Sequence, residues 1–295
     1  DRAVEPSLRI LSPSTPGGLG AVHPAWEADI AALGPWAEGV GAFVAARALG
    51  PGHPSDVIIL EECASTMDEA WKLLASGALE AWGSVLCARQ SGGRGQLRRT
   101  WLAPPGNLSV SMVLPDLPAR LADMASLLLG HAVAEALERE IGAAILVKWP
   151  NDLLTRDGKV GGILVEERAG RLVAGLGLNL FAAPPLSALR EDHAAQATAL
   201  PALPGSIGPL RLWLRLLETV RQEVERLAAD DSSASLSYLL TKRLAYLGER
   251  VRILDGTERF EARLIGIATD GGLVVESFGR EGGVSTLYSG CVFPL

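Results

Sequence analysis

Two alternating segments joined by a two-residue turn place the strongest constraint on the fold. Residues 159–168 read KVGGILVEER and residues 171–180 read RLVAGLGLNL, with Ala169-Gly170 between them. Apolar side chains recur in both at about every second position, which is the period of a β-strand with two different faces. The first segment also carries Gly161 and Gly162, where a ligand or another backbone can approach closely. We predict an antiparallel pair of strands here.

Other strand and helix patterns surround this pair. Strands are predicted at 56–62, 84–89, 107–115 and 143–150, because these short apolar runs are rich in β-branched residues. Helices are predicted at 66–77, 117–141, 208–229 and 233–247. The first helix begins at Thr66-x-x-Glu69, which has the spacing of a capping box. The mixture of both element types predicts an α/β or α+β fold.

Changes in composition and residue pattern divide the chain into three predicted regions: residues 1–55, 56–247 and 248–295. The last region holds short strands with turns between them, which is typical of a small barrel of about 45 residues. The first region is rich in Pro, Gly and Ala around one predicted helical patch within 25–49, and it is net acidic. We interpret it as an extension or small subdomain without an assigned role.

Charge and composition narrow the function. The formal net charge of −7 argues against general nucleic-acid binding, and residues 1–55 lack a basic recognition helix. The three scattered cysteines form no CxxC pair and favour the reducing cytoplasm, and the four scattered histidines give no zinc-site spacing. No apolar run is long enough for a membrane helix, and the acidic start is unlike a secretory signal. We therefore expect a cytoplasmic protein that does not bind DNA.

A basic, glycine-rich loop interrupts this acidic chain. Residues 89–101 read RQSGGRGQLRRTW, and no Asp or Glu occurs between Ala81 and Pro115. Clustered guanidinium groups without nearby carboxylates suit an anion, and glycines let backbone N–H groups approach it. The dinucleotide pattern GxGxxG fails because residue 98 is arginine, and no GK[ST] follows. The loop therefore contains neither of these two common phosphate-binding motifs, and the kind of anion stays open.

A second polar group follows the strand predicted at 143–150. Lys148, Asn151, Asp152 and Lys159 cluster around its end, where sites of α/β proteins usually gather polar residues. Lys159 is followed closely by Gly161 and Gly162. Asp152 could either bind Mg²⁺ or orient Lys148, and the sequence does not choose between them.

Together these motifs resemble the bacterial biotin protein ligases. The resemblance rests on Ser65-Thr66, on Gln90 with GGRGQLRRTW, on VKWPNDL, and on KVGGILVE followed by GLGLN. It runs from about residue 56 to the C-terminus. It implies a mixed-sheet catalytic domain of the biotin/lipoate ligase type, related to class II aminoacyl-tRNA synthetases, and an SH3-like terminal barrel.

The resemblance also implies an activity and its residues. Biotin and ATP would form biotinyl-5′-AMP with Mg²⁺ present, and biotin would then pass to a lysine of a biotin carboxyl carrier domain. Lys159 and Arg94 would be catalytic. Biotin would contact Ser65, Thr66, Gln90, Gly93, Arg94, Gly95, Lys159 and Gly162, while the adenylate would contact Arg99, Trp101, Asn151 and Asn179. Asp152 is a candidate metal ligand, no resident prosthetic group is expected, and homodimer formation is left open.

Several positions depart from the family pattern. Gln96 stands where the family has a second loop arginine, Arg98 replaces a glycine, Met67 replaces an asparagine, and Ser109 replaces an aromatic residue. Gln96 favours an alternative in which the chain binds biotin or its adenylate as a regulator and transfers it weakly. A lipoate or octanoate protein ligase is the other alternative. It is less favoured because the loop lacks the His and Asp of that family and WPND is present.

Overall fold

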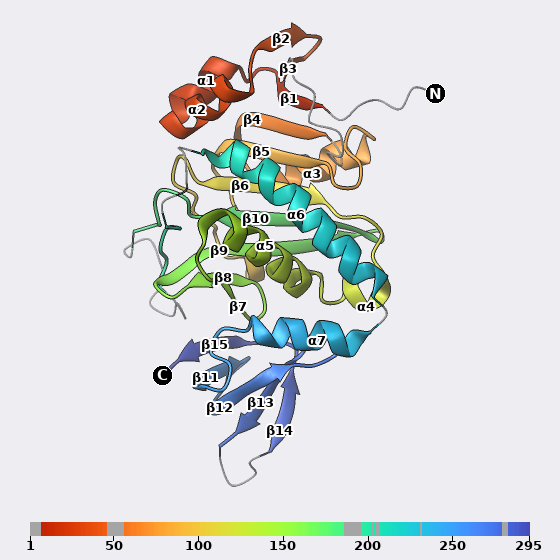
Figure 1. The fold of residues 1–295 in the computed structure, drawn as a ribbon, viewed down its shortest axis with the longest axis vertical. Coiled ribbons are helices and arrows are strands. Elements are labelled where there is room, and N and C mark those ends of the chain that lie inside the picture. The colour runs from red at the N-terminus through yellow and green to blue at the C-terminus, as the bar shows by residue number, and fades with distance from the viewer. Residues whose placement is uncertain are drawn as a thin grey trace.

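The computed structural model describes residues 7–45, 56–185, 196–201, 203, 207–230, 232–278 and 283–295, without the side chains of Arg98 and Ser233. Its main feature is a mixed ten-stranded sheet (Figure 1). In spatial order the strands are β2 (Trp36–Gly39), β3 (Ala42–Ala45), β1 (Leu8–Leu11), β4 (Val57–Cys63), β5 (Ser84–Gln90), β6 (Leu108–Val113), β10 (Arg171–Leu178), β9 (Gly158–Arg168), β8 (Asp152–Thr155) and β7 (Leu146–Lys148). The β1–β4 and β4–β5 pairs are parallel, and the other neighbours are antiparallel.

Helices cover both faces of this sheet. On one face lie α5 (Ala125–Ile141) and α6 (Pro209–Ala229), which pack against each other in front of the strands in Figure 1. The other face carries α3 (Thr66–Ala75), whose Met67, Ala70 and Trp71 form a smaller core with the strands beneath. The candidate site lies on this second face. No helix among the described residues is both long and apolar enough to cross a membrane.

The described part of the N-terminal region is built into the main sheet. Strands β1, β2 and β3 extend the sheet beyond β4, while α1 (Pro16–Val22) packs against β4 and β5 and α2 (Pro24–Leu33) packs against α6. The helical patch predicted within 25–49 is wrong from Gly34 to Ala45. There Gly34-Pro35 ends the helix, and β2 and β3 form a hairpin around Gly41, whose φ is +69°. Residues 1–6 and 46–55 of this region lie outside the described part.

The alternating pair is confirmed: β9 and β10 pair antiparallel with Arg168 opposite Arg171. The helix predicted over 117–141 is two helices, α4 (Ala119–Ala122) and α5, because the chain turns at Asp123-Met124 and buries both Leu121 and Met124. The strand predicted over 143–150 is shorter in the structure and consists only of β7. After β7 the chain turns back and pairs with it as β8, a strand that the sequence did not indicate. Helix α7 (Ser233–Lys242) ends earlier than predicted.

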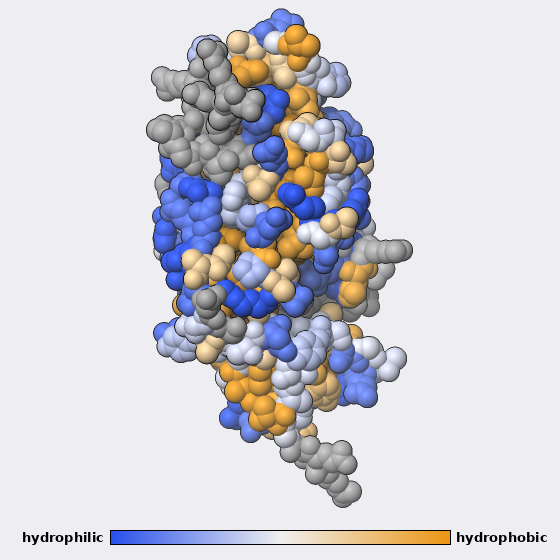
Figure 2. All heavy atoms as spheres, turned by 90° about the vertical axis from the view of Figure 1, so that its right-hand side faces the viewer, coloured by the Kyte–Doolittle hydropathy of each residue, from blue (hydrophilic) through white to orange (hydrophobic). Residues whose placement is uncertain are grey.

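The C-terminal region forms a second, antiparallel sheet. Its order is β14 (Val284–Leu287), β13 (Leu273–Ser277), β12 (Glu258–Ile267), β11 (Arg250–Asp255) and β15 (Cys291–Pro294). The described strands leave β14 and β15 as edges, so the sheet is open and the predicted barrel is not confirmed. Figure 2 shows apolar side chains grouped at this end of the molecule, and exposed Ile265, Phe278 and Val284 belong to this sheet or its flanking turns.

Candidate functional site

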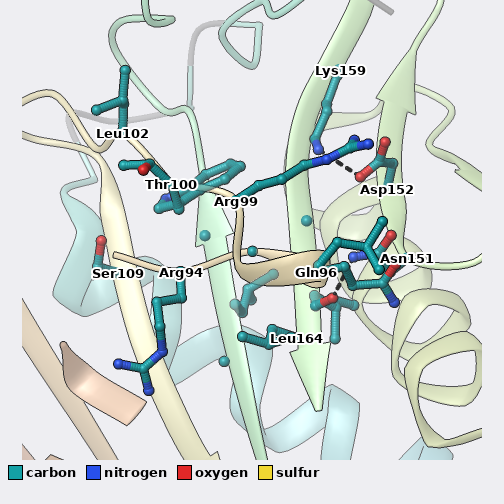
Figure 3. A pocket seen from close by; sticks show the side chains of 18 of the residues that line it. Arg94, Gln96, Arg99, Thr100, Leu102, Ser109, Asn151, Asp152, Lys159 and Leu164 are labelled. Carbon is teal, nitrogen blue, oxygen red and sulfur yellow. Dashed lines mark hydrogen bonds and ion pairs between the residues drawn. The ribbon is translucent and has the colours of Figure 1, made fainter. Parts of the chain in front are cut away.

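A pocket of about 430 Å³ lies on the α3 face of the main sheet (Figure 3). The floor of the pocket consists of two rows of residues on that face, which the register of the strands places side by side. One row runs Ser109, Gly177, Gly162 and Asp152 across four strands, and the other runs Ser111, Gly175 and Leu164 across three. Because the first row consists of small residues until it reaches Asp152, it forms a trough that leads to a charged end.

The opposite end of the pocket is neutral and satisfies its own hydrogen bonds. The hydroxyl groups of Thr66 and Ser111 lie 2.9 Å apart, and the Thr66 hydroxyl also donates to Gln90 Oε1 at 3.2 Å. Gln90 Oε1 further accepts from the backbone N of Thr66 at 2.9 Å. This satisfies one of the free N–H groups at the start of α3. The predicted capping box is therefore wrong: Thr66 faces the pocket, and a side chain from β5 replaces the cap.

Lys148, Asp152 and Lys159 form the charged end. Lys159 Nζ lies 2.6 Å from Asp152 Oδ1, and Lys148 Nζ lies 3.4 Å from Oδ2. Burial opposes the charge of Asp152, but the two lysines outweigh it and hold the pKa of this carboxyl below its ordinary value. Asp152 is the only acid among the described lining residues, so this end carries a net positive charge. Of the two roles that the sequence left open, this geometry favours the orientation of lysines.

Trp101 lies between the two ends. A Cβ built on Gly177 would come within 2.3 Å of the indole, so the ring packs directly on the glycine backbone. Lys159 Nζ is 5.7 Å from the centroid of the ring. The indole N–H is buried and has no hydrogen-bond acceptor among the described residues. A buried donor without a partner is costly.

The basic loop brings its backbone to the pocket but turns one arginine aside. Arg94 and Gly95 line the pocket, and Gly93 is packed under Trp101, whose N donates to Gly93 O at 2.9 Å. Both terminal nitrogens of Arg94 bond to Asp68 at 2.7 Å, and the guanidinium holds the pKa of Asp68 below its ordinary value. Figure 3 shows Arg94 pointing away from Lys159 and Asp152.

The C-terminal sheet closes part of the pocket. Gly290, Cys291 and Phe293 contribute to its lining. Arg99, an exposed residue of the loop, donates to Cys291 Sγ over 3.9 Å. Gln96 also lines the pocket (Figure 3). The loop and the second sheet therefore form one wall.

The two predicted asparagines occupy different environments. Asn151 Nδ2 donates to Ile163 O at 2.8 Å, which ties the turn after β7 to β9. Asn179 is only 2 % exposed, and its Nδ2 donates to Thr198 O at 3.0 Å. Its Oδ1 has no donor among the described residues. Asn179 therefore lines the pocket and has a buried acceptor without a donor among the described residues.

The structure brings the predicted residues together around this pocket: all of them line it except Gly93, which lies directly behind Trp101. Sequence reasoning missed Ser111, Gly175, Gly177 and Asp68 as parts of the site. The alternation in residues 107–111 (NLSVS) was the available signal for Ser111, since Ser109 and Ser111 share one face of a strand. No local signal pairs Asp68 with Arg94.

A second cavity lies away from this pocket, among α5, α6, α7 and β7. Its lining mixes acids and bases, and the nearly buried His131 lies 3.1 Å from Glu223 there. Burial and the nearby Arg243 lower the pKa of His131. Within the described residues, no group of three His, Cys, Asp or Glu could hold a metal ion here or elsewhere.

Comparisons with known proteins point in one direction. A model of the biotin/lipoate A/B protein ligase family matches residues 60–180. The chain is 31 % identical over 219 residues to the biotin–[acetyl-CoA-carboxylase] ligase of Paracoccus denitrificans, covering 72 % of this chain and 90 % of that protein. It is 33 % identical over 229 residues to the Mycobacterium tuberculosis protein of the same name, covering 72 % and 78 %.

A solved structure gives the same likeness in three dimensions. The biotin protein ligase of Aquifex aeolicus, in complex with biotin and ATP, superposes with a TM-score of 0.64 at 25 % identity. The match covers 80 % of this chain and 97 % of that one. Each of these three proteins is thus matched over most of its own length.

Proposed function

Because the chain belongs to the biotin/lipoate A/B protein ligase family, we propose that it is a biotin protein ligase. It joins biotin to ATP as biotinyl-5′-AMP, releases pyrophosphate, and passes biotin to a lysine of a biotin carboxyl carrier domain. We propose that it acts in the cytoplasm, as its scattered cysteines also suggest. The open C-terminal sheet is the proposed counterpart of the family's SH3-like barrel, since its five short strands are antiparallel.

The observation that carries the proposal is one pocket with a neutral end and a cationic end. Biotin has an uncharged ring system with N–H and C=O groups, and a carboxylate at the end of its chain. The hydroxyls and amide of Thr66, Gln90 and Ser111 match the ring system, because they offer donors and acceptors without charge. The trough of small residues then leads the chain of biotin toward Lys159.

Lys159 is the proposed catalytic residue at the charged end. In the first step the biotin carboxylate attacks the α-phosphate of ATP, the new C–O–P anhydride forms, and pyrophosphate leaves. Both reacting groups are anions, so a fixed ammonium stabilises the crowded transition state more than the separated reactants. Asp152 holds Lys159 in place through the 2.6 Å contact. In the second step the carrier lysine amine attacks the anhydride carbonyl, and AMP leaves.

The remaining contacts are proposed from the lining. Ser65, Gly93, Gly95 and Gly162 border the biotin carboxylate and its chain, while Arg99, Trp101, Asn151 and Asn179 border the adenylate. The free Oδ1 of Asn179 suits a nucleobase amino group, and Trp101 offers a flat apolar surface. Arg94 is a proposed second cation, with a smaller contribution because Asp68 already compensates its charge.

Mg²⁺ enters this proposal as part of the substrate MgATP. Both oxygens of Asp152 already accept from lysines, and the described residues offer no cluster of three metal ligands. The residues present therefore do not fit a metal held by the protein alone, and no step is assigned to one.

A transfer assay tests the proposed function. The purified protein is incubated with MgATP, a biotin carboxyl carrier domain, and either biotin or lipoate, and the carrier mass is measured. We expect one biotin added per carrier, no product without ATP, and none with lipoate. Lipoylation without biotinylation would favour the lipoate ligase alternative. A tightly bound adenylate with an unmodified carrier would favour the regulatory binder that Gln96 suggests.

A further inference from the structure

The ring of His23, at the junction of α1 and α2, contacts two loops of the catalytic region. Its centroid lies 5.0 Å from that of Phe181. The same ring packs on Gly106, because a Cβ built there would come within 2.7 Å of Nδ1. The Nδ1 atom also accepts from Ala25 N at 3.2 Å and so caps α2. One side chain of the N-terminal region therefore supports two segments that are far apart in sequence.

Asn107 ties these two segments into one unit. Its Oδ1 accepts from the backbone N of Leu180 at 2.9 Å and of Phe181 at 3.1 Å. Its Nδ2 donates to Ala182 O at 2.7 Å. Asn107 is only 3 % exposed, so these bonds have little competition from water. We call the segments 104–107 and 180–184, joined in this way, the rim unit.

The rim unit continues directly into the pocket. Asn179, with its free Oδ1, is the residue before Leu180, and Pro184 at the other end of the segment lines the pocket. Ser109 follows Asn107 by two positions and lies on the floor. A shift of the rim unit would therefore move Pro184 relative to Lys159 and strain Asn179, whose backbone N also donates to Val160 O at 2.7 Å. Thr66 and Gln90 are held by other elements.

We propose that His23 is a positioning residue for the nucleotide side of the pocket. Its ring holds the rim unit, and thereby Asn179, where the adenine nucleotide binds. This inference rests on the proposed function and gives part of residues 1–55 a role in it. The ring and the cap are separable: contact with Gly106 and Phe181 needs a flat ring, whereas the cap needs only a hydrogen-bond acceptor.

Two variants separate these roles. His23→Asn keeps a good cap residue but removes the ring, and His23→Phe keeps a ring but removes the cap. We expect His23→Asn to raise the KM for ATP about three- to tenfold, with the KM for biotin unchanged, as for coupled residues outside a site. We expect His23→Phe to lower Tm while leaving the KM for ATP within about twofold of wild type.

Thr15→Ala is the matched control, because the Thr15 hydroxyl caps α1 by accepting from Gly18 N. It should lower Tm and leave both KM values unchanged. If the KM for ATP follows Tm in all three variants, or if both KM values rise together, the inference is wrong. A wild-type protein that makes no biotinyl-AMP would instead refute the proposed function. Calorimetric ATP binding to wild type and His23→Asn still tests the inference in that case.

Discussion

At one end of the pocket, Thr66, Gln90 and Ser111 satisfy one another through neutral hydrogen bonds, whereas at the other end Lys148 and Lys159 share the carboxylate of Asp152. Both ends lie on the same face of the same sheet. The neutral end is complete by itself, and a ligand there exchanges one set of hydrogen bonds for another. The charged end has one cation more than it has carboxylates, so an anion adds stabilisation. We therefore expect the first end to determine affinity for biotin and the second to determine the rate of adenylation.

The largest expected effect is at the charged end. Lys159→Ala should raise the activation free energy of adenylation by about 2–4 kcal/mol. Losing a single charge-stabilising donor from a preorganised site has a cost of this size. Pyrophosphate release measures it. Transfer from preformed biotinyl-AMP should suffer less, because the anhydride is already activated. Lys72→Ala, which removes an exposed lysine paired with Glu69 on α3, is the control. A wild-type rate for Lys159→Ala would refute this placement of the active site.

Arg94→Ala should have a smaller effect on the same step, about tenfold, because the guanidinium is already neutralised by Asp68. Asp68→Asn is the informative partner. If the pair only orders the loop, the single variants and the double variant should slow pyrophosphate release to the same extent. An Arg94→Ala defect as large as that of Lys159→Ala would mean that Arg94 leaves Asp68 during the reaction and acts as a second catalytic cation.

At the neutral end, Thr66→Val should weaken biotin binding by about 0.5–1.5 kcal/mol, because it removes one hydroxyl from the triad at nearly constant volume. The KM for biotin should rise, while the maximal rate of adenylation and the KM for ATP stay unchanged. Steady-state kinetics with each substrate varied in turn gives the result. A fall in the maximal rate would show that the two ends are not independent.

The smallest expected effect concerns Gln96, which lines the pocket from the loop. Gln96→Arg adds a cation near the adenylate, and partly exposed charge pairs contribute about 0.2–1 kcal/mol. The bound biotinyl-AMP should therefore dissociate a few times more slowly, as measured by exchange with unlabelled adenylate. Gln96→Lys should act in the same direction. Unchanged or faster dissociation in both variants would place residue 96 away from the adenylate phosphates.

The sequence alone determined the β9–β10 pair, and it marked the basic, glycine-rich loop and the KWPND segment as separate motifs. These features are local, because alternation along a strand and motif spacing depend on near neighbours. The C-terminal strands were likewise indicated by their turns, although β15 was missed. The sequence also did not indicate that this sheet is open, because the order of its strands depends on pairing between distant segments.

Only the tertiary structure decided which partners the functional side chains have. Thr66 reads locally as a helix cap, yet Gln90 of β5 takes over the cap and Thr66 turns to the pocket. Arg94 reads as a free cation, yet Asp68 of α3 pairs with it. The segment after Leu33 reads as helix, yet it extends the main sheet as β2 and β3. In each case the deciding contact joins elements distant in the chain. Its free energy depends on packing that residue patterns do not encode locally.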